Sequence, residues 1–172
     1  EKVHGMTTAD ADRFFGAVLV VAGLVGTLTG GFVATAWQKR NPAGYAWLLC
    51  VSVLSSAPFC FLALESSSRD AAMAFLAAGI FMLFLSTGPI NTLILETVPV
   101  NLRTSAMALS IFMIHLFGDM WSPEIVGRLA DSLGGNLQRA VMILPGVLLL
   151  GGFLWVALAV KMRGNAINNI KG

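Results

Sequence analysis

Long apolar runs separated by short polar linkers organise the whole chain. A run of about 20 apolar residues, when helical, is long enough to cross the hydrocarbon core of a bilayer. The pattern predicts five such helices, at residues 14–37, 45–64, 71–95, 104–124 and 140–160. Residues that break helices mark the linkers between them, at 38–42, 66–70, 98–103 and 132–136. We therefore expect a turn between antiparallel neighbours at each linker.

Composition supports a membrane protein and argues against most soluble functions. Hydrophobic residues make up 56% of the 172 residues and charged residues only 12%, against about 25% charged in soluble domains. The formal net charge of +2 is small and the basic residues are scattered, so no nucleic-acid partner is expected. The fold class that follows is an all-α membrane protein, a bundle of five transmembrane helices, which is not an enzyme and needs no cofactor.

Basic residues in the short loops indicate the orientation of the chain. One side of the membrane collects Lys39, Arg40, Arg103, Lys161, Arg163 and Lys171, with Glu96 as the accompanying acid. On the other side, the basic residues are mixed with six acids. We therefore predict a cytoplasmic carboxyl terminus in the plasma membrane or a bacterial inner membrane. Residues 1–13 then form an extracytoplasmic segment, 14–164 the bundle and 165–172 a cytoplasmic tail.

The segment before the first span is polar. Residues 1–13 carry three acids and lack the pattern of a cleavable signal peptide. The start at Glu1 suggests the boundary of a longer chain. At the other end, the fifth span has neither an ionisable side chain nor a hydroxyl, so we expect it to be peripheral and to face lipid.

Small residues recur at four-residue spacing in the first span. Ala22, Gly26 and Gly30 have this spacing, which lets helix backbones approach closely. Close packing of helices is one interpretation. In the alternative, the glycines let the helix bend or slide between states, and Thr27 and Thr29 face a transport pathway.

A proline lies among hydrogen-bonding side chains in the third span, at residues 86–92. Proline removes a backbone donor and frees a carbonyl oxygen, which polar groups or water must satisfy. Interrupted helices of transporters expose their backbone to substrates or ions in this way. Ser86 and Asn91 are therefore candidates for the pathway. The alternative is a tolerated kink, with Asn91 bonded to a neighbouring helix.

Two ionisable residues stand inside the fourth span, where they are costly. Side chains of this kind at membrane depth usually face a protein interior or a water-filled cavity and take part in transport. His115, Asp119 and Ser122 follow one another at i, i+4 and i+7, which places them on one face of an α-helix. The His/Asp pair is a candidate to carry a coupling proton or to bind a cationic or hydroxyl-bearing substrate group. The alternative is a pair that only fixes helix packing.

A metal site is not expected in this chain. His115 and Asp119 supply two ligands, and no further His, Cys or carboxylate stands at a spacing that completes a coordination shell. A hydrolytic triad is not expected either, because one helix does not build a nucleophile together with its oxyanion hole.

Two segments resemble the Spinster family of the major facilitator superfamily. They are SSAPFCFLAL at 55–64 and HLFGDMWSPEIVGRLAD at 115–131, and the likeness extends through NPAG at 41–44 and a Val-Pro-x-x-x-Arg-x-Ser-Ala pattern at 98–106. The resemblance implies that the five spans are the eighth to twelfth helices of a 12-helix fold, the carboxyl-terminal half without its first helix. It also implies that the first, third and fourth spans line a central cavity and that the second and fifth are peripheral.

The resemblance further implies a gating role for loop charges. Superfamily members carry a Gly-x-x-x-Asp-x-x-x-x-Arg type signature between the second and third helices, which is echoed between the eighth and ninth. Here Thr35 stands in the Asp position. The candidate gating residues are Gly31, Lys39, Arg40, Glu96 and Arg103. In the alternative, these are exposed loop ion pairs worth about 0 to 1 kcal/mol each.

The function that the resemblance implies is secondary transport of amphipathic, lipid-like substrates such as sphingolipids or lysophospholipids by alternating access, with proton coupling through His115 and Asp119. The expected partners are the lipid substrate, protons and the amino-terminal half of the same transporter. Two alternatives remain open. One is a facilitator for organic anions or drugs, and the other is a non-transporting membrane scaffold.

Overall fold

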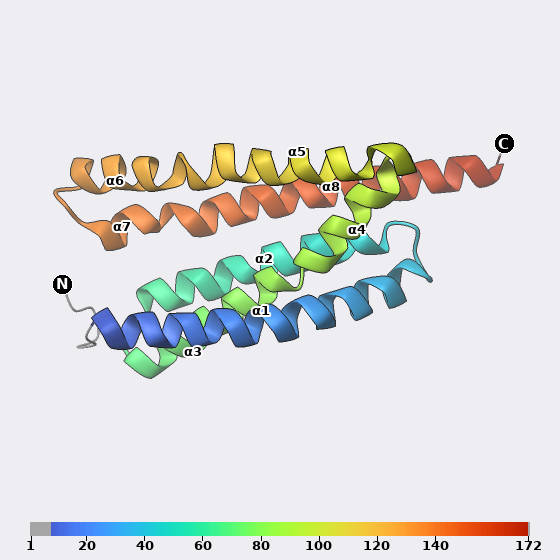
Figure 1. The fold of residues 1–172 in the computed structure, drawn as a ribbon. Coiled ribbons are helices and arrows are strands. Elements are labelled where there is room, and N and C mark those ends of the chain that lie inside the picture. The colour runs from blue at the N-terminus through green and yellow to red at the C-terminus, as the bar shows by residue number, and fades with distance from the viewer. Residues whose placement is uncertain (1–7, 172) are drawn as a thin grey trace. The chain divides into compact units, whose positions relative to one another are not determined.

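The computed structural model describes residues 8–171, so most of the predicted extracytoplasmic segment and the last residue of the predicted tail lie outside the described residues. The described chain folds as a series of helices (Figure 1). In chain order they are α1 (Thr8–Gln38), α2 (Gly44–Glu65), α3 (Arg69–Phe84), α4 (Thr87–Thr97), the 3-10 helix η2 (Val100–Leu102), α5 (Arg103–Met113), the π-helix η3 (Ile114–Asp119), α6 (Ser122–Ser132), α7 (Leu137–Val141) and α8 (Ile143–Lys171).

The five predicted spans are confirmed as helical stretches. Within the described residues, five stretches are long and apolar enough to cross a membrane: Asp12–Gln38, Gly44–Glu65, Arg69–Thr97, Val100–Ser132 and Leu137–Ala166. Each predicted span lies inside one of them. The third, fourth and fifth stretches are composed of more than one helix, so their interruptions need a physical cause.

Three of these interruptions lie just before a proline. α3 gives way to α4 at residues 85–86, ahead of Pro89, and η3 gives way to α6 at 120–121, ahead of Pro123. α7 gives way to α8 at residue 142, ahead of Pro145. A proline lacks the N–H that would bond the carbonyl four residues earlier, and its ring clashes with that carbonyl. By contrast, Pro58 lies inside α2 without interrupting it.

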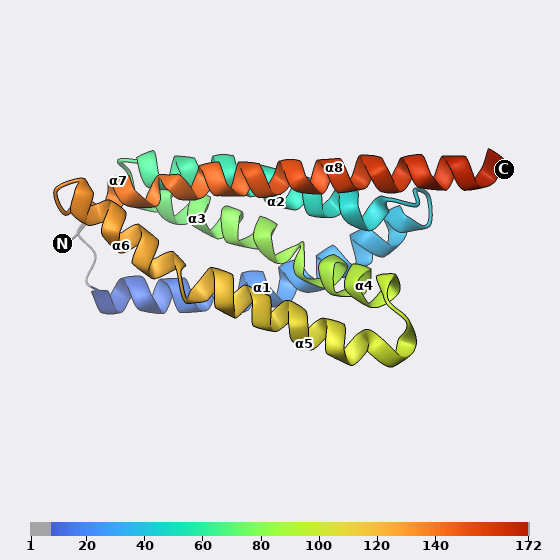
Figure 2. The same cartoon turned by 90° about the horizontal axis from the view of Figure 1, so that it is seen from above.

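The first of two compact units contains α1, α2, α3 and most of α8, in residues 8–90 and 145–171. Its core follows α2, where Leu48, Leu49 and Ala57 are buried. α3 and α1 both pack against α2. α8 runs alongside α2 (Figure 2), and Gly152 of α8 lies against Leu54.

A glycine seam joins α1 to α3 within this unit. A Cβ atom placed on Gly26 would lie 2.9 Å from Cβ of Phe84 and 3.1 Å from the carbonyl oxygen of Phe81. A Cβ on Gly30 would overlap the carbonyl oxygen of Leu85 and lie 2.7 Å from its carbonyl carbon. Only a residue without a side chain allows this approach. The close-packing interpretation of the first span is therefore confirmed for these two glycines.

The second compact unit comprises residues 91–144, which hold the end of α4, then η2, α5, η3, α6 and α7. Neither α5 nor η3 has a buried residue. α6 and α7 pack against each other across a turn at Gly134 and Gly135, whose φ angles are +70° and +83°. Such left-handed conformations favour glycine. This unit is therefore far more open than the first.

Candidate functional site

The ionisable pair of the fourth span lies in η3. Nδ1 of His115 and Oδ2 of Asp119 are 2.5 Å apart and hydrogen-bonded, and both side chains are 67% exposed. The structure thus brings together the two residues that the sequence singled out as the proton site.

One geometric expectation about this pair needs correction. The sequence predicted a regular α-helix through His115, Asp119 and Ser122. Instead, Ile114–Asp119 is a π-helix, a turn follows at 120–121, and Ser122 begins α6. The N–H of Met120 accordingly donates to the carbonyl of His115, five residues back, at 3.1 Å. Pro123 is the physical reason, because a regular α-helix would set its ring against the carbonyl of Asp119.

The polar residues of the first and third spans have local partners where the structure shows them. The hydroxyl of Ser86 donates to the carbonyl of Leu83 at 2.6 Å, so it bonds back to its own helix. Pro89 is buried, whereas Asn91 is exposed. Thr27 and Thr29 are partly buried on α1. Their proposed roles in a pathway stay predictions.

These candidates fall into two groups. Thr27, Thr29 and Ser86 belong to the first compact unit, and Asn91, His115, Asp119 and Ser122 belong to the second. Within the second unit, His115 and Asp119 are joined directly by a hydrogen bond. The His/Asp pair is therefore the part of the candidate site with a defined geometry.

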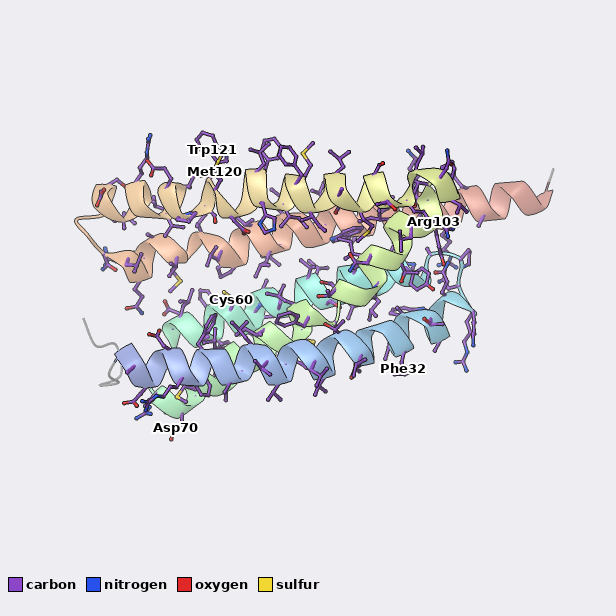
Figure 3. The ribbon with its side chains drawn as sticks, in the orientation of Figure 1. Phe32, Cys60, Asp70, Arg103, Met120 and Trp121 are labelled. Atoms are coloured by element: carbon purple, nitrogen blue, oxygen red, sulfur yellow. The ribbon has the colours of Figure 1, made fainter. Side chains whose placement is uncertain are left out.

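The predicted gating residues have clear local surroundings. Nε of Arg103 donates to the carbonyl of Leu95 at 2.9 Å, so Arg103 caps the last turn of α4 (Figure 3). A cation at this position is favoured by the partial negative charge of a helix carboxyl end. Glu96 follows Leu95 and is exposed. A gating role for either residue stays a prediction.

The loop after α1 contains a clamp that the sequence did not reveal. Nε2 of Gln38 donates to the carbonyl of Pro42 at 3.1 Å, and the N–H of Tyr45 donates to Oε1 of Gln38 at 3.0 Å. This amide holds the end of α1 against the start of α2 and leaves Lys39 and Arg40 exposed. A single glutamine at the end of an apolar run gives no sequence signal for this role.

The Thr35 position of the loop signature also has a local explanation. The Thr35 hydroxyl donates to the carbonyl of Gly31 at 2.8 Å, within α1. A hydroxyl bonded to its own helix carries no charge to an opposing loop. The aspartate-based charge lock of the superfamily signature is therefore not reproduced at this position.

A second charged pair lies on α6. Nε of Arg128 donates to Oε1 of Glu124 at 2.7 Å, and both side chains are largely exposed. The i, i+4 spacing in the sequence was a sufficient signal for this pair. No group of three His, Cys, Asp or Glu side chains among residues 8–171 is placed to hold a metal ion.

Comparison with known proteins places the chain beside the spinster proteins, although no family model matches it. It is 37% identical over 146 residues to the "Probable sphingolipid transporter spinster homolog 2" of Arabidopsis thaliana, an alignment that covers 85% of this chain and 30% of the relative. It is 31% identical to "Protein spinster homolog 1" of Xenopus tropicalis, over 90% of this chain and 32% of the relative. It is 28% identical to the "Sphingosine-1-phosphate transporter SPNS2" of Danio rerio, over 84% and 31%.

These relatives extend well beyond the present chain. The chain spans about 30% of the length of the curated relatives that it matches. Two of the three names describe transporters, and none describes an enzyme. The family resemblance found in the sequence is thereby confirmed. With its five apolar helical stretches and this homology over most of its length, the chain belongs by homology to the spinster family of the major facilitator superfamily and is a multi-pass integral membrane protein.

Proposed function

We propose that this chain is the carboxyl-terminal part of a proton-coupled secondary transporter for amphipathic lipids such as sphingolipids or lysophospholipids. The names of two relatives, a "Probable sphingolipid transporter" and a "Sphingosine-1-phosphate transporter", support the substrate class. The observation that carries the coupling is the 2.5 Å contact between His115 and Asp119 inside an apolar span.

The chemistry of the pair explains how a proton can change its charge. With a neutral imidazole and an ionised carboxylate, the pair has a net charge of −1. One added proton gives an imidazolium beside a carboxylate, with no net charge. Since net charge at membrane depth is costly, protonation favours a state in which the pair is shielded from water. A cationic substrate group can neutralise the carboxylate in the same way and so competes with the proton.

The proposed transporter requires helices beyond those of the present chain. An alternating-access cavity needs a second set of helices, and the relatives are about three times as long as the matched region. We propose that an amino-terminal half of the same protein faces the first, third and fourth spans. In this arrangement the carboxyl terminus is cytoplasmic and the membrane is the plasma membrane or a bacterial inner membrane.

Transport by the full-length protein in proteoliposomes tests the role of the pair. We expect Asp119→Asn to lose the acceleration that a pH gradient gives to uptake of a fluorescent lysophospholipid, while it retains exchange without a gradient. Asp131→Asn is the matched control, because Asp131 is an exposed acid near the end of α6, outside the pair. Gradient-driven transport at the full rate by Asp119→Asn would refute proton coupling through this pair.

A second measurement separates coupling from substrate class. If the wild-type protein moves an organic anion in a gradient-dependent manner but leaves lysophospholipid and sphingosine untouched, the lipid assignment is wrong even though the pair is a proton site. A reporter enzyme fused after Gly172 that is active only outside the cell would overturn the proposed orientation.

A further inference from the structure

The π-helical segment η3 is an unusual element that transport chemistry alone does not explain. Six residues, Ile114–Asp119, are wound with hydrogen bonds that reach five residues back, as in the bond from Met120 N–H to the His115 carbonyl. Short π segments are rare, act as one-residue insertions into an α-helix, and occur frequently at functional sites. Conversion of such a segment into a regular α-helix would incorporate the inserted residue into the normal α-helical turn.

The surroundings of η3 leave room for such rewinding. The segment has no buried residue, and within its compact unit its main contacts are with α5 and α6, its neighbours along the chain. A Cβ atom added to Gly118 would meet nothing within 4 Å. Met120 and Trp121, at the junction with α6, are more than half exposed and project from the helix (Figure 3). No buried side chain of η3 therefore holds the segment in one register.

Pro123 favours the π register over the α register. Pro123 cannot donate to the carbonyl of Asp119, and in a regular α-helix its ring would press on that carbonyl. The hydrogen bond between His115 and Asp119 lies entirely within the π segment and ties its second residue to its last. Because residues four apart meet in either winding, this bond is compatible with both registers, and Pro123 is what disfavours the α register.

We propose that η3 is a register switch that converts between π and α winding and thereby turns α6 relative to α5. Absorbing one residue into a regular α-helix rotates everything beyond it by about 100° and moves it about 1.5 Å along the axis. α6 then presents a different face, and Trp121 leaves its present direction. The inference concerns the backbone, so it goes beyond the proposed function and does not depend on the identity of the substrate.

Distance measurements between spin labels on α5 and α6 of the full-length protein test the switch. Labels at Ala108→Cys and Gly127→Cys report the rotation, in a background where Cys50 and Cys60 are replaced by alanine. We expect two distance populations in the wild-type sequence. Pro123→Ala restores the missing N–H, so we expect it to raise the ratio of the α-register population to the π-register population about tenfold or more.

Two further variants make the result decisive. Deletion of Gly118 removes one residue from the π segment and should leave only the α-register population. Pro58→Ala is the matched control, because Pro58 already lies in an uninterrupted α-helix, and it should leave both populations unchanged. A single population in the wild type that Pro123→Ala does not move overturns the switch, whether or not the protein transports lipid. If the deletion variant does not fold, the comparison of Pro123→Ala with Pro58→Ala decides alone.

Discussion

Two proline interruptions, one in each compact unit, have the same chemical origin and opposite surroundings. Pro89 is buried, and the carbonyl of Leu85, four residues before it, lies against Gly30 of α1. Pro123 is exposed, and the segment before it is a π-helix whose ionisable pair is largely exposed. Proline sets the place where each helix breaks. A neighbouring helix covers the first break, and no residue is buried in the π-helix at the second.

The two breaks differ in how closely their neighbours pack against them. At the first break, a Cα hydrogen of Gly30 faces the carbonyl that Pro89 leaves without its usual donor, a weak contact that recurs between closely packed helices. Such a break is held in one geometry by its neighbour. The second break has no buried residue in the π segment before it, which carries His115 and Asp119. A closely packed seam and an open junction are therefore combined in one chain.

The largest loss of unfolding free energy is expected from Gly30→Ala, at the break between α3 and α4 that α1 covers. The new Cβ would overlap the carbonyl of Leu85, so α1 and α3 must separate, and overpacking of this kind costs about 1 to 3 kcal/mol of unfolding free energy or more. Unfolding of the full-length protein in mixed detergent micelles measures it. Gly31→Ala is the control, because a Cβ there meets nothing within 4 Å. Equal losses of unfolding free energy in the two variants would show that close packing at Gly30 does not stabilise the protein.

A smaller loss is expected from Gly134→Ala in the second unit. This residue has open space around it but a φ of +70°, so the cost comes from backbone conformation alone and should be about 1 to 2 kcal/mol. The same unfolding assay applies. Gly134→Asn should lose clearly less, because Asn tolerates the left-handed region. If the Asn variant loses as much unfolding free energy as the Ala variant, the left-handed backbone conformation is not the cause of the loss.

A gain is expected from Gly127→Ala on α6. This glycine lies inside a helix with nothing within 4 Å of the added Cβ, so alanine should raise the unfolding free energy by up to about 1 kcal/mol. The sign is opposite to that for Gly30, which sharpens the contrast between the two units. A loss instead of a gain would show that another part of the full-length protein covers this face.

The smallest effect is expected from Glu124→Gln, which removes the exposed ion pair with Arg128. Pairs at i, i+4 on a helix surface contribute about 0.2 to 0.5 kcal/mol, so the unfolding free energy should change by no more than this. Raising the salt concentration should remove the difference between wild type and variant. A loss above 1 kcal/mol would mean that α6 is packed rather than open.

The sequence predicted the spans well and their interiors only in part. Apolar length alone located all five helical stretches, and Pro89 marked the region of the break in the third. Pro123 carried the same signal, but the i, i+4, i+7 spacing of the polar residues favoured a regular α-helix and hid the π segment. The spacing of His115 and Asp119 correctly predicted their contact, since neighbours four apart meet in either winding.

Side-chain partners in the loops were less predictable. The sequence predicts a gating role for Arg103 but not the hydrogen bond from its Nε to the carbonyl of Leu95. Its role depends on the direction of the chain between α4 and α5, which no local pattern encodes. The clamp at Gln38 likewise depends on the path of the loop to Tyr45. Periodicity reports which residues share a helix, but it does not report how two helices are joined.

The seam between α1 and α3 has a consequence for synthesis of the protein in the cell. The two helices belong to the first and third membrane-crossing stretches, so the glycine face of α1 is made well before its partner exists. At roughly 5 to 20 residues per second, the approximately 60 residues between Gly30 and Pro89 take about 3 to 12 s to translate. During this interval the glycine face of α1 is without its α3 partner. The seam can therefore form only after the third stretch has been made, later than the insertion of α1.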